Sequence, residues 1–121
     1  MPKKVLIVDD SVTIRQMVAF TLRESHFDVV EAENGADAIK KLVGHKPDLI
    51  VTDLNMPVMD GLNFIRNARA LPATRYIPIL MLTTESQAEK KAEAKAAGAT
   101  GWIVKPFDPT KLLAVIGKLL P

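Results

Sequence analysis

The sequence predicts an α/β domain in which five consecutive βα units form a doubly wound parallel sheet. Three observations lead to this fold class. Five short apolar runs alternate with longer segments of helical periodicity. The runs are apolar almost without interruption, as strands covered on both faces are. Aspartates stand at the ends of two of these runs, where an open α/β sheet forms its ligand crevice.

The expected strands cover residues 5–9, 29–32, 49–53, 79–83 and 101–105. Connections between parallel strands are right-handed almost without exception, which leaves few topologies for such a series of units. The order 2-1-3-4-5 is common among doubly wound sheets. In that order the first and third strands are neighbours, so the aspartates that end them are expected to lie side by side.

The expected helices fill the intervals between the strands. The first covers residues 12–25 with Ser11 placed to cap it, and the fourth is an alanine-rich segment, residues 87–97, that stops at Gly98. The fifth opens around Pro109, which suits a first helical turn, and is expected to end at Pro121. The second and third are indicated by apolar residues at helical spacing, namely Ala36, Ile39, Leu42 and Val43, then Leu62, Phe64, Ile65 and Ala68.

The composition argues against several classes of protein. No apolar stretch approaches the ~20 residues that a membrane span requires, and the run behind Met1 is too short for a signal peptide. The absence of cysteine excludes disulfides and thiolate metal sites. The basic residues behind the net charge of +2 are spread along the chain, which disfavours nucleic acid as a direct partner. We expect a cytoplasmic protein with a single domain, residues 1–121, and no output domain.

Asp9 and Asp10 end the first expected strand, and Asp53 ends the third. Helix capping accounts for one acid at a helix start but not for two. An ordinary turn accounts for an acid such as Asp53, but it does not require that acid to end a buried strand. Carboxylates this close raise one another's pKa unless a cation is present, and a divalent ion with oxygen ligands is the natural one. A carboxylate beside bound Mg2+ can accept a phosphoryl group, so the pattern points to phosphate chemistry.

Short motifs recur at the ends of the expected strands and helices. They are Val8-Asp9-Asp10-Ser11, Thr52-Asp53-Leu54-Asn55-Met56-Pro57 with Asp60-Gly61, Leu82-Thr83-Thr84, Ala97-Gly98-Ala99 and Val104-Lys105-Pro106-Phe107. Each is weak alone, but all of them in this order are hard to obtain by chance. Over essentially its whole length the chain resembles the receiver domain of two-component response regulators, most closely the stand-alone, CheY-like chemotaxis type. That family has the flavodoxin-like strand order given above, so the topology and the resemblance are not independent.

The resemblance implies roles for the acids and for one lysine. Asp53 would be the phosphoacceptor in a Mg2+-dependent reaction, Asp10 would bind the metal directly, Asp9 would act mainly through a bound water, and Asn55 would supply a backbone carbonyl. Lys105 taken alone reads as an ordinary surface lysine, whereas the resemblance implies that its ammonium pairs with a phosphoryl oxygen. The Lys105–Pro106 bond is a candidate cis peptide, since X-Pro bonds adopt that form at modest cost.

The resemblance also implies a conformational switch. Thr83 alone could be no more than a β-branched strand residue, and Trp102 no more than a packing residue. In the family a hydroxyl at the position of Thr83 bonds the phosphoryl group, and an aromatic ring at the position of Trp102 fills the space that a loop then vacates. Members usually carry tyrosine or phenylalanine there and a smaller residue at the position of Thr84, so both are departures. Thr84, Glu85 and Asn55 occupy positions that tune hydrolysis.

The implied partners are proteins. A chemotaxis-type histidine kinase or histidine phosphotransfer domain would donate the phosphoryl group, and a downstream protein would bind the surface formed by the fourth helix, fifth strand and fifth helix. The charged residues of the fourth helix read either as a solvated face or as a contact edge on that surface; they are Glu89, Lys90, Lys91, Glu93 and Lys95.

Two other functions remain open from the sequence alone. A phosphatase of the haloacid dehalogenase type also uses an aspartate and Mg2+, but it carries Asp-x-Asp where this chain has Asp9 and Asp10 adjacent. A flavodoxin-like nucleotide binder needs an anion cradle after the first strand, where two aspartates would repel phosphate. We therefore expect a phosphorylation switch rather than an enzyme that acts on an external substrate.

Overall fold

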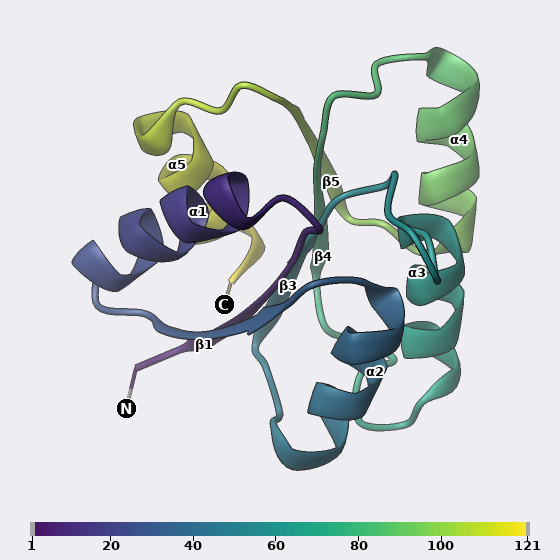
Figure 1. Cartoon of the computed structure of the whole chain (residues 1–121), viewed down its shortest axis with the longest axis horizontal. Coiled ribbons are helices and arrows are strands. Elements are labelled where there is room, and N and C mark those ends of the chain that lie inside the picture. The colour runs from purple at the N-terminus through teal and green to yellow at the C-terminus, as the bar shows by residue number, and fades with distance from the viewer. Residues whose placement is uncertain (1, 121) are drawn as a thin grey trace.

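Five parallel strands form the centre of the molecule in a computed structural model that describes residues 2–120 (Figure 1). They are β1 (Lys4–Val8), β2 (Asp28–Ala32), β3 (Leu49–Thr52), β4 (Ile79–Thr83) and β5 (Gly101–Val104). The strand order is β2-β1-β3-β4-β5, and every neighbouring pair is parallel. The predicted topology is confirmed, and β1 lies beside β3.

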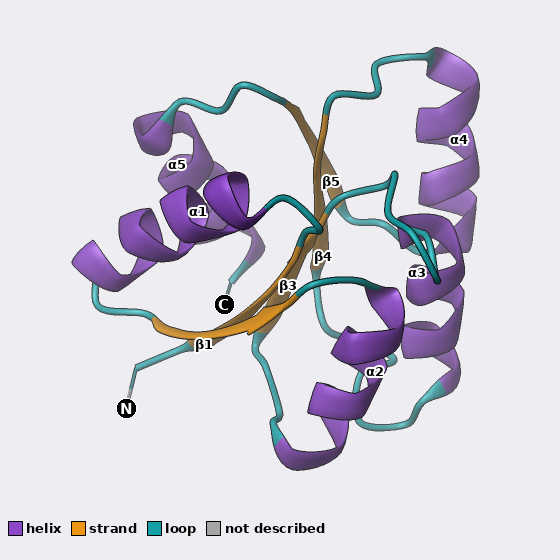
Figure 2. Ribbon diagram, viewed as in Figure 1, coloured by secondary structure: helices purple, strands orange, loops and turns teal. Residues whose placement is uncertain are grey.

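The helices cover both faces of this sheet. They are α1 (Val12–Glu24), α2 (Gly35–Gly44), α3 (Gly61–Ala70), α4 (Ala88–Ala97) and α5 (Pro109–Leu119). Helices α1 and α5 lie on one face, and α2, α3 and α4 on the other, with loops joining helices and strands at the two edges (Figure 2). The predicted end of the last helix, at Pro121, lies outside the described residues. None of the helices between residues 2 and 120 combines the length and the apolar character that a membrane crossing needs.

Two apolar layers, one on each face, explain why the central strands are almost continuously apolar. In β1, Leu6 and Val8 join the layer beneath α2, α3 and α4. Val5 and Ile7 join the layer beneath α1 and α5. When the side chains on both faces of a strand are buried, the strand has no polar face, and its sequence is apolar without alternation.

The helix ends follow from local hydrogen bonding. Ser11 caps α1, accepting the N–H of Ile14 at 3.3 Å, as predicted. Asp60 caps α3 in the same way. Gly98 ends α4 with a φ of 122°, a conformation that glycine adopts without steric cost. The Lys105–Pro106 bond is cis, as the sequence predicted.

The structure differs from the prediction at several element ends and at one side chain. Strands β1 and β2 begin one residue earlier than expected, α1 ends one residue earlier and α4 begins one residue later. Strands β1, β3 and β5 end one residue earlier than expected, so Asp9, Asp53 and Lys105 are the first residues beyond them. Their backbone N–H groups still bond to the neighbouring strand, at 2.8 to 3.1 Å, so the pairing fades gradually. Val43, expected on the apolar side of α2, is 90% exposed. Leu42 and Ile39 of the same helix pack into the core instead.

Candidate functional site

Three acids meet at the carboxyl edge of the sheet, as predicted. Asp9, Asp10 and Asp53 each offer a carboxylate oxygen, and these oxygens all lie within 4.8 Å of one another. The register of β1 on β3, which pairs Val8 with Thr52, places Asp9 and Asp53 side by side. Asp9 and Asp53 are buried, whereas Asp10 is exposed. The site therefore has a closed inner side and one acid facing solvent.

Lys105 lies among these acids. Its Nζ is 2.8 Å from Asp9 Oδ2 and 3.1 Å from Asp53 Oδ2, and its side chain is only 10% exposed. Reading Lys105 as an ordinary surface lysine is therefore wrong. The strand order places β4 between β5 and β3, and both β4 and β3 between β5 and β1, so the long side chain reaches past β4 to Asp53 and past β4 and β3 to Asp9. One ammonium therefore contacts two of the three acids.

Burial and ion pairing have opposite effects on the pKa values of this cluster. Burial raises the pKa of Asp9, and the ammonium of Lys105 and the N–H of Ser11 offset this only in part. Burial lowers the pKa of Lys105, but the carboxylates of Asp9 and Asp53 more than reverse that effect, so its pKa is raised overall. Lys105 is therefore held in its charged form.

Backbone groups fix the other oxygen of each buried acid. Asp53 Oδ1 accepts the N–H of Leu54 at 2.7 Å, and Asp9 Oδ1 accepts the N–H of Ser11 at 2.9 Å. Each carboxylate thus has one oxygen toward its own loop and one toward Lys105. The plane of each carboxylate is set before any ligand arrives.

Gly61 lets the start of α3 approach Asp53. A Cβ at this position would lie 2.2 Å from the Asp53 carbonyl oxygen and 2.8 Å from Leu54 Cα, closer than atoms tolerate. The N–H of Gly61 donates to the carbonyl of Leu54 at 2.8 Å. The sequence showed the Asp60-Gly61 motif but gave no reason for the glycine. Close packing against the loop that carries Asp53 supplies that reason.

Arg15 contacts the acidic cluster although no motif in the sequence singled it out. Its Nη1 donates to the backbone carbonyl of Asp9 at 2.7 Å, and its Nε donates to Glu31 at 3.3 Å. The guanidinium side chain is only 15% exposed. The one signal in the sequence was its position: Arg15 is a charged residue at helical spacing from Val18 and Leu22, on the side of the first helix that packs against the sheet.

The donor set fits a hard divalent cation. Mg2+ takes oxygen ligands almost exclusively and uses few of them from a protein, so carboxylate oxygens that converge from Asp9, Asp10 and Asp53 are a suitable set. Asn55, the predicted source of a backbone carbonyl, follows Asp53 by two residues on the same loop and has an exposed side chain. The Lys105 ammonium shows that this cluster already binds positive charge.

Thr83 and Trp102 are joined through the loop after β4. Thr83 is fully buried, and its Oγ1 accepts the N–H of Glu85 at 3.2 Å. The indole N–H of Trp102 donates to the carbonyl of the same residue, Glu85, at 3.1 Å. Thr84, the residue between Thr83 and Glu85 in the sequence, is exposed. Glu85 therefore bonds to both Thr83 and Trp102.

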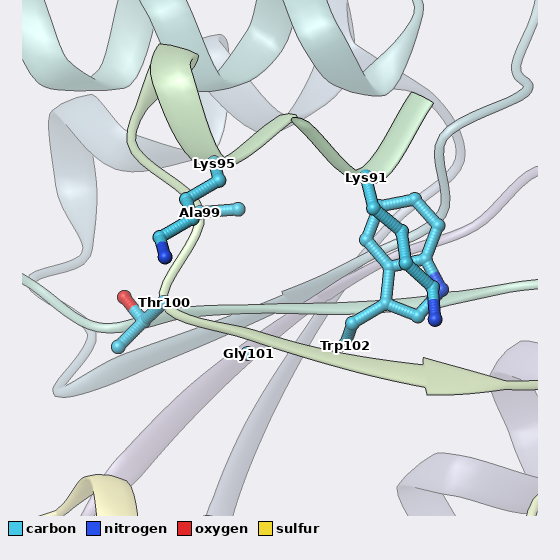
Figure 3. Close-up of a pocket in the computed structure, with 6 residues that line it drawn as sticks. All are labelled: Lys91, Lys95, Ala99, Thr100, Gly101 and Trp102. Carbon is cyan, nitrogen blue, oxygen red and sulfur yellow. The ribbon is translucent and has the colours of Figure 1, made fainter. Parts of the chain in front are cut away.

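Trp102 also forms one wall of a surface hollow between α4 and β5 (Figure 3). The Nζ of Lys91 lies 5.8 Å from the centroid of the indole ring, within reach of a cation–π interaction. Lys95, one helical turn further on, lines the same hollow. This hollow lies on the surface that the sequence analysis assigned to a downstream partner.

The chain is similar to response regulator proteins both in sequence and in structure. The model of the response regulator receiver domain family matches residues 5–117. The chain is 40% identical over 117 residues to the chemotaxis protein CheY-3 of Vibrio cholerae, which covers 96% of this chain and 90% of that protein. It is 38% identical over 116 residues to the phosphate regulon transcriptional regulatory protein PhoB of Escherichia coli, covering 96% of this chain and 51% of PhoB. A solved structure of Vibrio cholerae chemotaxis protein CheY4 superposes with a TM-score of 0.96 at 48% identity, over 99% of this chain and 100% of that one.

Proposed function

The chain belongs to the response regulator receiver domain family, and on this basis we propose that it is a phosphorylation-driven switch whose phosphoacceptor is Asp53. The observation that carries the proposal is the set of contacts around Asp53. A buried carboxylate has two further acids within 4.8 Å and a lysine ammonium at 3.1 Å. A carboxylate so placed could accept a phosphoryl group, whose negative charge would be offset by the Lys105 ammonium and by a divalent cation held by the acids.

In the proposed reaction a carboxylate oxygen of Asp53 attacks phosphorus. An oxygen–phosphorus bond forms, the bond from phosphorus to the donor imidazole nitrogen breaks, and its electron pair stays on that nitrogen. Asp10, Asp53 and the backbone carbonyl of Asn55 would hold Mg2+ directly, and Asp9 would hold it through a bound water. When bound, Mg2+ neutralises the acids and the charge on the phosphoryl oxygens. No general base is needed, because Asp53 is the nucleophile in its ionised form.

Lys105 would change partners during this reaction. It pairs with Asp53 Oδ2 and Asp9 Oδ2 in the unphosphorylated protein. A phosphoryl group on Asp53 would bring anionic oxygens to the same place, where the ammonium can pair with them. Autocatalysed dephosphorylation would use the same residues, with Thr84, Glu85 and Asn55 at the rim tuning the access of water.

The proposed switch runs from Thr83 to Trp102. Rotation of the Thr83 side chain to donate its hydroxyl to the phosphoryl group would move its Oγ1, which accepts the N–H of Glu85 at 3.2 Å. The loop would then shift and alter the bond from Trp102 to the Glu85 carbonyl. Trp102 lies beside Lys91 in the hollow of Figure 3, so the surface of α4, β5 and α5 would change for a downstream protein.

The proposed partners follow from the family. A histidine kinase or histidine phosphotransfer domain would donate the phosphoryl group, and the similarity to chemotaxis proteins favours an output in chemotaxis or motility control within the cytoplasm. The protein would catalyse only its own phosphorylation and dephosphorylation.

Incubation with acetyl phosphate and Mg2+ tests the proposal. We expect intact mass spectrometry to show one added phosphoryl group, lost when EDTA is present or when Asp53 is changed to Asn. Asp60→Asn is the matched control, because it removes an acid from the same edge of the sheet and keeps a good helix cap. A folded wild-type protein that gains no phosphoryl group, or that hydrolyses a small phosphate ester instead, would contradict the proposal.

A further inference from the structure

Arg15 links three elements around the acidic cluster. From α1 its guanidinium donates through Nη1 to the backbone carbonyl of Asp9 at 2.7 Å and through Nε to Glu31 Oε1, on β2, at 3.3 Å. Its side chain is 15% exposed. A mostly buried guanidinium retains its position only while its donors are paired. Here the pairing sets its orientation toward the loop between β1 and α1.

The carbonyl that Arg15 contacts belongs to the peptide group between Asp9 and Asp10. The N–H of Asp9 donates to the carbonyl of Ala32 at 3.1 Å, so Asp9 is held on both sides of its Cα. Rotation of the Asp9–Asp10 peptide would turn Asp10, which is exposed and follows directly, away from the other acids. The contact from Arg15 opposes that rotation.

Glu31 holds the guanidinium in place. Its Oε1 accepts from Arg15, and its Oε2 pairs with Arg23 Nη2 at 3.4 Å. The Arg23 side chain is 54% exposed and, within residues 2–120, it pairs with Glu31 and not with the acidic cluster. The two arginines therefore share an anchor, but Arg15 alone extends from it to Asp9.

We propose that Arg15 is a positioning residue for the acidic cluster, holding the Asp9–Asp10 peptide so that both carboxylates converge with Asp53. The inference rests on the proposed function, because convergence matters only if these acids bind Mg2+. A guanidinium offers separate nitrogens in fixed directions, here Nη1 to the Asp9 carbonyl and Nε to Glu31, whereas a lysine ammonium is a single point charge. Residues that orient metal ligands typically change metal affinity about 10–100-fold when they are removed.

Isothermal titration of Mg2+ into the full chain tests this inference, with the unfolding midpoint of every variant measured alongside. We expect Arg15→Gln to weaken the Kd for Mg2+ by about tenfold or more, and Arg15→Lys to recover part of the loss. Arg23→Gln is the matched control, because it removes a guanidinium from the same helix and the same glutamate but leaves the Asp9 carbonyl bonded. It should bind Mg2+ as the wild type does. In nuclear magnetic resonance spectra, Arg15→Gln should shift the amide signals of Asp10 and Ser11, whereas Arg23→Gln should not.

The outcomes separate the inference from the proposed function. Arg15→Gln with wild-type Mg2+ affinity, whatever its stability, would overturn the inference and leave the proposed function intact. A folded wild-type protein that neither binds Mg2+ nor accepts a phosphoryl group from acetyl phosphate would overturn both. If Arg15→Gln does not fold, Glu31→Gln decides, because it keeps Arg15 but removes its anchor. It should weaken Mg2+ binding in the same direction, and unchanged binding would overturn the inference.

Discussion

The ammonium of Lys105 lies 3.1 Å from the carboxylate of Asp53, although β4 separates the strands after which the two residues stand. The same ammonium lies 2.8 Å from Asp9. One ammonium thus contacts two of the three acids, so a single positive charge faces three carboxyl groups. This relationship gives the resting site a residual negative charge, which a divalent cation can satisfy.

Replacing Lys105 by Met should tighten Mg2+ binding while impairing phosphorylation. Two unit charges about 4 Å apart interact by about 1 kcal/mol in water and more near a protein surface. Removing the ammonium, which competes with the ion for the acids, should therefore lower the Kd by about tenfold or more. Phosphorylation by acetyl phosphate should nevertheless slow, because the ammonium that would meet the phosphoryl oxygens is gone. Calorimetry and intact mass measure the two effects. Lys111→Met, which removes an exposed lysine from α5, is the control, and equal behaviour of both variants would contradict the prediction.

Mg2+ should stabilise the folded protein through Asp10. Ligand bound only by the native state stabilises it by about 2.7 kcal/mol at about 100 times Kd. We expect this rise in the free energy of unfolding for the wild type and for Asp60→Asn, and its loss in Asp10→Asn. Chemical denaturation with and without Mg2+ measures it. A rise that survives in Asp10→Asn would show that the ion binds elsewhere.

Trp102 should report the switched state. The chain has one tryptophan, so its fluorescence is unambiguous. Addition of beryllofluoride with Mg2+ should change the emission, because the Glu85 carbonyl that accepts the indole N–H moves with the loop. Thr83→Ala should still accept a phosphoryl group but lose most of the emission change. An emission spectrum that is the same before and after addition to wild type would remove Trp102 from the mechanism.

Asp37 should make stability depend on pH in a predictable direction. Burial acts to raise its pKa, but the N–H of Glu33 and the ammonium of Lys41, at 3.1 and 3.2 Å, outweigh burial and lower the pKa overall. A pKa below the unfolded value means that the ionised side chain stabilises the folded state above the usual aspartate pKa of about 3.9, and that this stabilisation is lost as pH falls through the folded pKa. Asp37→Asn should therefore be less stable than wild type at neutral pH, with the difference disappearing in acid. Thermal unfolding across this pH range checks it, and a difference independent of pH would contradict the assignment.

Much of the fold was predictable from the sequence because its signals are local. The apolar runs marked the strands, Ser11 and Gly98 marked helix ends, and the alternation of strands and helices limited the topology. The convergence of Asp9 and Asp53 followed from that topology. Element ends differed by a residue because hydrogen bonding between strands fades gradually.

The contacts that organise the site could not be predicted in this way, because they depend on tertiary distances. Nothing in the sequence around Lys105 says that its ammonium reaches past β4 to two acids. Arg15 lies in an ordinary helical pattern, and its bond to the Asp9 carbonyl requires the packing of α1 against β2. The shared contact of Thr83 and Trp102 with Glu85 depends on the path of a loop. The sequence places each of these residues in a strand, helix or loop, but the contacts that each makes at the site depend on the folded structure.

The most direct test of the central claim is to locate the phosphoryl group. The protein is incubated with acetyl phosphate and Mg2+, reduced with borohydride to convert an aspartyl phosphate to homoserine, and then digested and sequenced by mass spectrometry. Conversion at residue 53 alone, absent with EDTA, is the predicted result. Conversion at Asp9, Asp10 or Asp60 with residue 53 unmodified, or no conversion in a folded sample, would contradict the assignment of Asp53 as the phosphoacceptor.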